Sequence, residues 1–153
     1  MTIPAINNVG VLNRYKKFIK PDDLPLIGMG EGNTPLIKAV TLGRITSADV
    51  YIKLEGCNPT GSFKDRGMVV AVSGALKDNK KYIICASTGN TSASASAYGS
   101  RYGLDTIVLV SETNIAKGKL SQAIAYGARI IAVRGNFDMA LNLVKQVGEK
   151  LDV

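Results

Sequence analysis

The sequence predicts an α/β protein with an open parallel sheet and flanking helices. Three apolar runs begin at Tyr82, Thr106 and Arg129, spaced 24 and 23 residues apart (106 − 82 and 129 − 106). Each run is continuously apolar, as expected of a parallel strand covered on both faces. Helical stretches lie between and after the runs, and they predict a βαβαβα unit with right-handed crossovers.

The helical stretches are recognised by apolar residues that recur with a period of 3.6. Leu120 and Ala123 follow this period before the third run, and Ala140, Val144 and Val147 follow it afterwards. Glycines at positions 103 and 127 stand where a helix would end and the chain would turn back into a strand.

The first eighty residues are less regular. Their pattern predicts one strand and one long helix, with a short helix near the start. The expected elements are a helix near 11–18, a loop at 28–35, a strand at 50–55, a turn at 58–61 and a helix at about 62–78.

Composition excludes several classes of site. The chain has 153 residues, 46% of them apolar and 20% charged, values that are ordinary for a soluble protein. Because histidine is absent, a Ser-His-Asp triad, a Cys-His pair and any histidine-ligated metal are excluded. Cys57 and Cys85 lie too far apart in the sequence for a metal-ligand or redox motif, so we expect two reduced thiols and no metal site.

No apolar run approaches the roughly 20 residues that span a bilayer, and the N-terminus lacks the layout of a signal peptide. We therefore expect a cytoplasmic protein without a membrane partner. The net charge of +7 favours either nucleic acid or an anionic small ligand. The basic residues are scattered and no aromatic platform accompanies them, so a nucleic-acid partner is not expected.

The segment 58–67, Asn-Pro-Thr-Gly-Ser-Phe-Lys-Asp-Arg-Gly, places a lysine at the start of the predicted long helix. Pro59 and Gly61 favour a sharp turn, and Ser62 is suited to cap the helix. Lys64 then falls in the first helical turn. Position alone favours a solvated lysine over a reactive one.

The segment 87–91, Ser-Thr-Gly-Asn-Thr, follows the first apolar run directly and opens the next helix. Ligands of open parallel sheets collect at the carboxyl ends of strands, and helix N-termini offer N–H groups to anions. The helix beyond carries only serine and alanine at 92–97, which allows close packing. From spacing alone, a ligand site and an ordinary polar loop are equally favoured.

Three segments together resemble the fold-type II pyridoxal-phosphate enzymes in order and relative spacing. They are residues 32–36 (Gly-Asn-Thr-Pro-Leu), 58–67 and 87–91. Within that group the residues of these segments are similar to those of the threonine synthase family, whose lysine motif is Ser-Phe-Lys-Asp-Arg-Gly. The dehydratase branch usually has an apolar residue at the position of Asp65 and reads Ser-Ala-Gly-Asn-His in the second motif.

The resemblance implies a role for five residues. Lys64 would hold the aldehyde of pyridoxal 5'-phosphate, and Asn90 would hydrogen-bond the 3′-oxygen of this cofactor. Ser87, Thr88 and Thr91 would contact the carboxylate or phosphate of the substrate. The implied reaction converts O-phospho-L-homoserine and water to L-threonine and phosphate in threonine biosynthesis.

The resemblance also implies that the sequence is an N-terminal portion. Residues 1–80 would begin the large cofactor-binding domain, and 81–153 would form most of the small domain. The family's later part supplies a glycine-rich loop for the cofactor phosphate and a hydroxyl facing the pyridine nitrogen. We therefore expect these 153 residues alone to lack activity and to bind the cofactor weakly, and the full-length enzyme to be a homodimer.

Two alternatives remain open at this point. One is a threonine or serine dehydratase or another related fold-type II enzyme. The other is a non-catalytic, truncated α/β module that acts as a binding or assembly partner.

Overall fold

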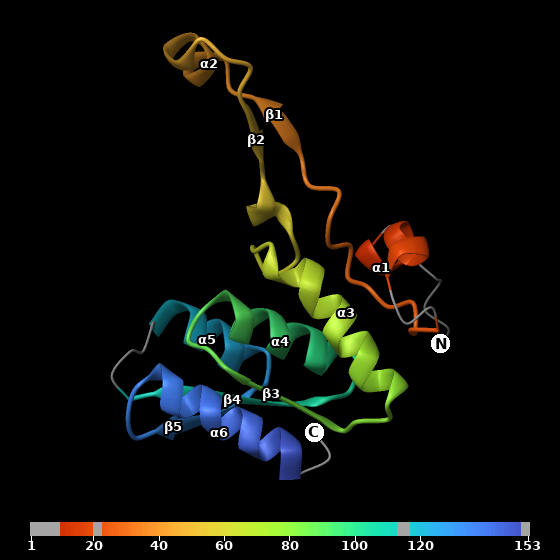
Figure 1. Cartoon of the computed structure of the whole chain (residues 1–153), viewed down its shortest axis with the longest axis vertical. Helices are drawn as coiled ribbons and strands as arrows, with labels where there is room; N and C mark the ends of the chain where they lie inside the picture. Colours follow the sequence, from red (N-terminus) through yellow and green to blue (C-terminus); the bar gives the residue numbers. More distant parts are fainter. Residues whose placement is uncertain (1–9, 20–22, 113–116, 151–153) are drawn as a thin grey trace.

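The computed structural model describes residues 10–19, 23–112 and 117–150. The first part of the chain forms a short helical segment, a protruding two-stranded arm and the long helix α3 (Figure 1). Its elements are α1 (Val11–Tyr15), η1 (Lys16–Phe18), β1 (Leu36–Lys38), α2 (Val40–Thr46), β2 (Tyr51–Lys53), η2 (Glu55–Cys57) and α3 (Lys64–Lys77).

The second part is the predicted alternation of strands and helices. Its elements are β3 (Tyr82–Ala86), α4 (Asn90–Arg101), β4 (Asp105–Ser111), α5 (Lys117–Ala125), β5 (Arg129–Val133) and α6 (Phe137–Lys150). The strands are parallel in the order β3-β4-β5, with Ile84 opposite Ile107 and Val108 opposite Ile130. The predicted α/β class with a parallel sheet is confirmed.

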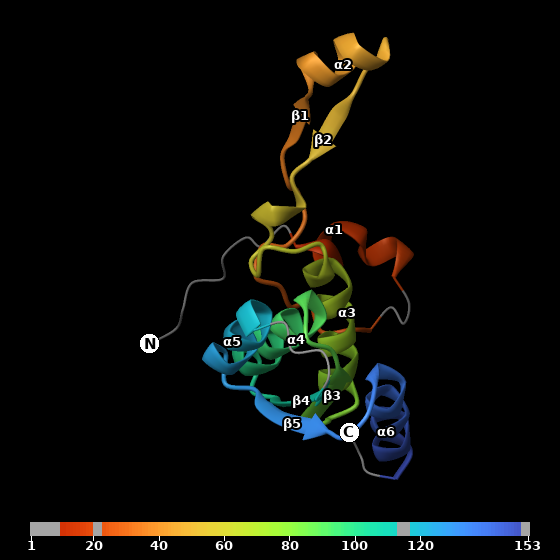
Figure 2. The same ribbon diagram turned by 90° about the vertical axis from the view of Figure 1, so that its left-hand side faces the viewer.

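Helices cover both faces of this sheet. Helices α4 and α5 pack against each other on one face, and α6 packs on β3 and β4 from the other, as Figures 1 and 2 show. Gly103 and Gly127 adopt φ values of +76° and +87° where the chain leaves α4 and α5, as the sequence predicts. Such left-handed backbone favours glycine because it has no Cβ.

Helix α4 is the most deeply buried element. All residues from Ser92 to Gly99 are buried, and α4 lies between α3 and the sheet. A Cβ at Gly99 would collide with Thr106 Oγ1 and with the side chain of Ile83. The small side chains therefore allow the helix to approach its neighbours closely, as expected.

The arm formed by β1, α2 and β2 departs from the prediction. The sequence predicts a strand at 50–55, whereas β2 spans Tyr51–Lys53 and pairs antiparallel with β1, which was not predicted. All six strand residues are exposed, so no alternation of buried and exposed side chains marks the ribbon. Helix α2 contains Gly43, which weakens a helical pattern.

None of the described helices is long and apolar enough to cross a membrane. The predicted boundary near residue 80 falls between α3 and β3, although α3 packs on α4. The division into two domains stays a prediction.

Candidate active site

The N-terminal ends of α3 and α4 carry the two predicted motifs. Both helices begin on the left of Figure 1 and run to the right, with α3 packed on α4. Lys64 is the first residue of α3 and Asn90 the first residue of α4. The fold thus brings the lysine segment and the loop 87–91 to the same end of two adjacent helices.

The lysine turn differs from the prediction in one detail. Helix α3 begins at Lys64, two residues after the predicted start, and the Lys64 N–H donates to Ser62 Oγ over 3.2 Å. The N-cap is therefore Phe63 and not the predicted Ser62, although the Ser62 hydroxyl still satisfies one of the free N–H groups at the helix start. The half-buried Lys64 side chain places Nζ 4.8 Å from the centroid of the exposed Phe63 ring.

The loop 87–91 is held by one hydrogen bond within the loop and one to strand β4. The Gly89 N–H donates to Ser87 Oγ over 3.1 Å, and the Ser87 N–H donates to the carbonyl of Leu109 on β4 over 3.2 Å. Ser87, Thr88 and Thr91 are half-buried. This arrangement holds the loop at the carboxyl end of β3, the edge where ligands of parallel sheets bind.

Asn90 carries the observation that points to a ligand. Its Oδ1 atom is buried, and it has no hydrogen-bond partner among the residues that the structure describes. Leaving a buried polar atom unpaired costs roughly 1–3 kcal/mol. Such an atom at a helix N-terminus, beside a half-buried lysine segment, fits a cofactor that offers polar ring substituents and an aldehyde.

Asp65 belongs to a buried hydrogen-bond network that the sequence did not predict. It is fully buried and accepts three hydrogen bonds. The Thr60 N–H and Thr60 Oγ1 donate to it over 2.7 and 2.6 Å, and Ser94 Oγ of α4 donates over 2.6 Å. The carboxylate therefore joins the lysine turn to the middle of α4.

A second carboxylate joins the lysine turn to the loop at 32–35. Glu55 accepts hydrogen bonds from Arg66 Nε and Nη2 over 2.8 and 2.7 Å. Thr34 Oγ1 and Asn58 Nδ2 also donate to Glu55, over 2.8 and 2.9 Å. The Gly32 N–H donates to Asn58 Oδ1 over 2.9 Å. The Arg66 guanidinium lowers the pKa of Glu55 to about 2, so the pair is ionised at neutral pH.

Helix α5 also reaches the lysine turn. Gln122 Nε2 donates to the carbonyl of Thr60 over 3.3 Å, and Lys119 Nζ donates to Gln122 Oε1 over 3.2 Å. Sequence reasoning assigned no role to Gln122. Its signal was only its place after the second strand, at the same edge of the sheet.

The two cysteines take no part in this arrangement. Both are free, with Cys57 exposed and Cys85 half-buried, and burial raises the pKa of the Cys85 thiol to about 11. Within the described ranges, no three acidic or thiol side chains gather where they could hold a metal ion.

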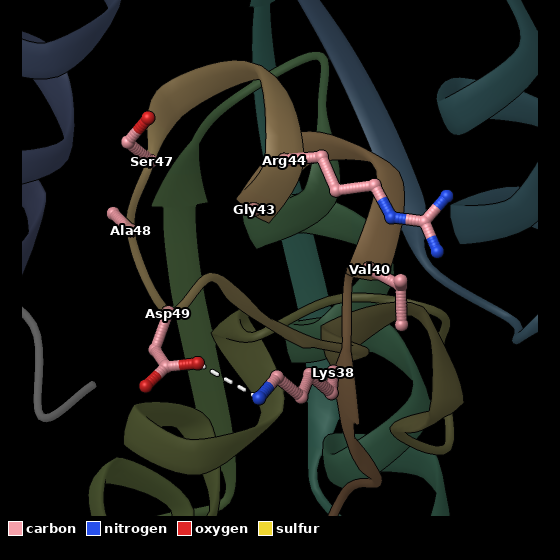
Figure 3. Close-up of a pocket in the computed structure, with 7 residues that line it drawn as sticks. All are labelled: Lys38, Val40, Gly43, Arg44, Ser47, Ala48 and Asp49. Atoms are coloured by element: carbon pink, nitrogen blue, oxygen red, sulfur yellow. Dashed lines mark ion pairs between the residues drawn. The ribbon is translucent and has the colours of Figure 1, made fainter.

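A pocket at the tip of the arm lies away from these residues (Figure 3). Lys38 and Asp49 form an ion pair of 2.7 Å there, and both side chains are exposed. An exposed pair contributes little free energy, and the seven residues that line the pocket are all exposed or half-buried. This pocket therefore gives no reason to assign it a role.

The fold and the site define an α/β protein with a lysine segment and a buried Asn90 Oδ1, unpaired among the described residues, at the N-terminal ends of two adjacent helices. Residues 27–152 match the family model described as pyridoxal-phosphate dependent enzyme. The chain belongs to this family of pyridoxal-phosphate-dependent enzymes.

Relatives in sequence are named threonine synthase. The chain is 53% identical to that of Halalkalibacterium halodurans over 142 residues, which cover 92% of this chain and 40% of the relative. It is 47% identical to that of Synechocystis sp. over 94% of this chain and 38% of the relative. The chain thus spans about 40% of the length of these relatives.

Solved structures agree on the fold. The processed form of threonine deaminase isoform 2 from Solanum lycopersicum matches with a TM-score of 0.68 and 26% identity, over 76% of this chain and 32% of the other. Maize serine racemase matches with a TM-score of 0.72 over 94% of this chain and 40% of the other, and at 17% identity it shows the fold alone.

Proposed function

We propose that the chain is the N-terminal part of a threonine synthase, a pyridoxal-phosphate-dependent lyase. The complete enzyme would convert O-phospho-L-homoserine and water to L-threonine and phosphate. The observation that carries the proposal is the buried Asn90 Oδ1 at the start of α4, which has no partner within the described part of the chain. Helix α4 is hydrogen-bonded to the lysine turn. The named relatives, 47 to 53% identical, support the substrate.

We assign the residues as follows. Lys64 Nζ would hold the cofactor aldehyde and, once the substrate amine has displaced it, would move protons at Cα and Cβ of the substrate as a free base. The Asn90 amide would hydrogen-bond the 3′-oxygen of the cofactor. The cofactor, when bound, supplies an electron sink for negative charge at these carbons. Ser87, Thr88 and Thr91 bind the carboxylate or phosphate of the substrate, since hydroxyls at a helix N-terminus suit anions. The net charge of +7 favours the approach of a doubly anionic substrate.

A dehydratase is the second candidate, because the matching tomato structure is a threonine deaminase. Asp65 argues against a dehydratase, because that branch usually has an apolar residue at this position. Its carboxylate is fully buried and accepts three hydrogen bonds. An apolar side chain at this position would leave the three donors unpaired. The homodimer and the cytoplasmic location expected from the sequence stay predictions.

The function is tested with a chimera that joins this chain to the remaining three-fifths of the Halalkalibacterium halodurans threonine synthase. We expect the chimera to release threonine and phosphate from phosphohomoserine, and the 153 residues alone to release neither. Release of ammonia and a 2-oxo acid from threonine, without phosphohomoserine turnover, would instead establish the dehydratase.

Replacement of Asn90 by alanine is expected to weaken cofactor binding while leaving stability nearly unchanged. Because Oδ1 has no described protein partner, its removal should leave the urea unfolding midpoint nearly unchanged. Loss of a hydrogen bond worth about 1.4 kcal/mol should weaken capture of pyridoxal phosphate about tenfold. Capture is measured by borohydride reduction at a series of cofactor concentrations, followed by mass spectrometry of the Lys64 peptide.

Asn142→Ala is the matched control, since Asn142 is exposed on α6 on the opposite face of the sheet. It should bind the cofactor as the unchanged chain does. Equal capture by the two asparagine variants would remove Asn90 from the proposed site.

A further inference from the structure

Three polar side chains of α4 lie at four-residue intervals: Asn90, Ser94 and Tyr98. Residues four apart occupy the same face of a helix, so these three form one stripe along α4. Ser94 Oγ donates to Asp65 over 2.6 Å, and Tyr98 Oη donates to Glu31 over 2.8 Å. The stripe therefore faces α3 and the loop that contains Glu31, and Asn90 stands at its end.

Ser94 differs from the other buried serines of α4. Ser92 Oγ donates to the Gly89 carbonyl and Ser96 Oγ to the Ser92 carbonyl, over 2.7 and 2.6 Å, so both bonds stay within α4 and its N-terminal loop. Ser94 Oγ instead leaves the helix and bonds to the residue that follows Lys64. All three serines are fully buried, which makes Ser96 a close match for Ser94 in size and surroundings.

The side chains that flank this stripe are small. Alanines occupy positions 93, 95 and 97, and all are buried. Side-chain ends lie about 6 Å from a helix axis, so a rotation of roughly 30° moves them by about 3 Å. Such a displacement equals the length of a hydrogen bond, so the rotation of α4 decides whether Asn90 reaches a ligand held at Lys64.

We propose that the Asp65–Ser94 hydrogen bond is a positioning device for the lysine site. It fixes the rotation of α4 against α3, so that the Asn90 amide and the Lys64 amine face the same ligand. Asp65 suits this role because its carboxylate is held at the same time by the Thr60 N–H and hydroxyl. Hydrogen bonds to a carboxylate are stronger and shorter than neutral ones. This inference rests on the proposed function of Lys64 and Asn90.

The test compares Ser94→Ala with Ser96→Ala in the 153-residue chain. Each variant loses one buried hydroxyl, so we expect similar decreases in the urea unfolding midpoint. The chain is mixed with pyridoxal phosphate and reduced with borohydride, and mass spectrometry measures label on Lys64 against label on the surface residue Lys77. If the Asp65–Ser94 hydrogen bond favours cofactor capture by about 1 kcal/mol, Ser94→Ala should carry about fivefold less label on Lys64. Ser96→Ala should show no such decrease.

Equal label on Lys64 in the two serine variants would overturn the positioning role and leave the cofactor site standing. In the unchanged chain, label on Lys64 no higher than on Lys77 would overturn the cofactor site and this inference together. A second pair of variants gives an independent readout. Asp65→Asn keeps the shape and one acceptor oxygen, so it should retain more label on Lys64 than Asp65→Ala; equal label in these two would also overturn the role.

Discussion

Replacement of Lys64 by alanine is expected to abolish covalent capture of pyridoxal phosphate at the start of α3. Only a primary amine condenses with the cofactor aldehyde, and the proposed site holds one at this position. The expected loss is complete, down to background, whereas the effects predicted above for Asn90 and Ser94 are partial. Stability should change little, because the Lys64 side chain is half-buried and its described contact is with the exposed Phe63 ring.

The measurement is borohydride reduction followed by peptide mass spectrometry, with two controls. Lys64→Arg keeps the positive charge but cannot condense with the aldehyde, so it should behave as alanine does. Lys77→Ala removes a lysine from the other end of α3, where it pairs with Asp23 over 2.7 Å, and should keep full label on Lys64. If Lys77→Ala lowers the total label as much as Lys64→Arg does, capture is unspecific and the proposed anchor is wrong.

Replacement of Glu31 by alanine is expected to cause the largest loss of stability. Glu31 is fully buried and accepts hydrogen bonds from the Val11 N–H, the Met29 N–H and Tyr98 Oη, over 3.0, 2.9 and 2.8 Å. Alanine would leave all three donors without this acceptor. An unpaired buried donor such as the Tyr98 hydroxyl costs roughly 1–3 kcal/mol, and the half-buried Val11 and Met29 N–H groups add to this loss, so the free energy of unfolding should fall by about 3 kcal/mol.

Urea unfolding of three variants checks this expectation. Tyr98→Phe removes one of the three hydrogen bonds and keeps the buried ring, so its loss should be about 1–2 kcal/mol. Glu149→Ala removes an exposed carboxylate on α6 and should change stability by less than about 0.5 kcal/mol. A Glu31→Ala loss as small as that of Glu149→Ala would show that the buried contacts contribute nothing.

Two buried carboxylates outside α4, Asp65 and Glu31, accept hydrogen bonds from its polar stripe. Asp65 holds it through Ser94 and Glu31 through Tyr98, and the burial of the Tyr98 hydroxyl beside Glu31 raises the pKa of Tyr98. Because its pKa is raised, the Tyr98 hydroxyl stays protonated and can donate its hydrogen bond to Glu31. These polar pairs add to the apolar packing of α4, in which Ala97 and Tyr98 belong to the hydrophobic core.

Sequence patterns predicted the regular half of the fold well. The runs beginning at Tyr82 and Arg129 became β3 and β5, and the run predicted from Thr106 became β4 beginning one residue earlier. The central strand β4 is mostly buried because helices cover the sheet on both faces there, and its apolar run is the sequence signal of that burial. Strands β3 and β5 are half-buried or exposed. The β1–β2 arm was missed in part because its strands are exposed on both faces and carry no periodic signal.

The sequence by itself determined the alternation of strands and helices, and it placed Lys64 and Asn90 at the starts of two helices. Only the tertiary structure decided which groups surround them. Asp65 directly follows Lys64 in the sequence, yet it bonds to Ser94, 29 residues away. Periodicity reports whether a side chain is buried, a local property. The partner of a buried carboxylate depends on which helices cross and at what rotation, and packing sets that in three dimensions.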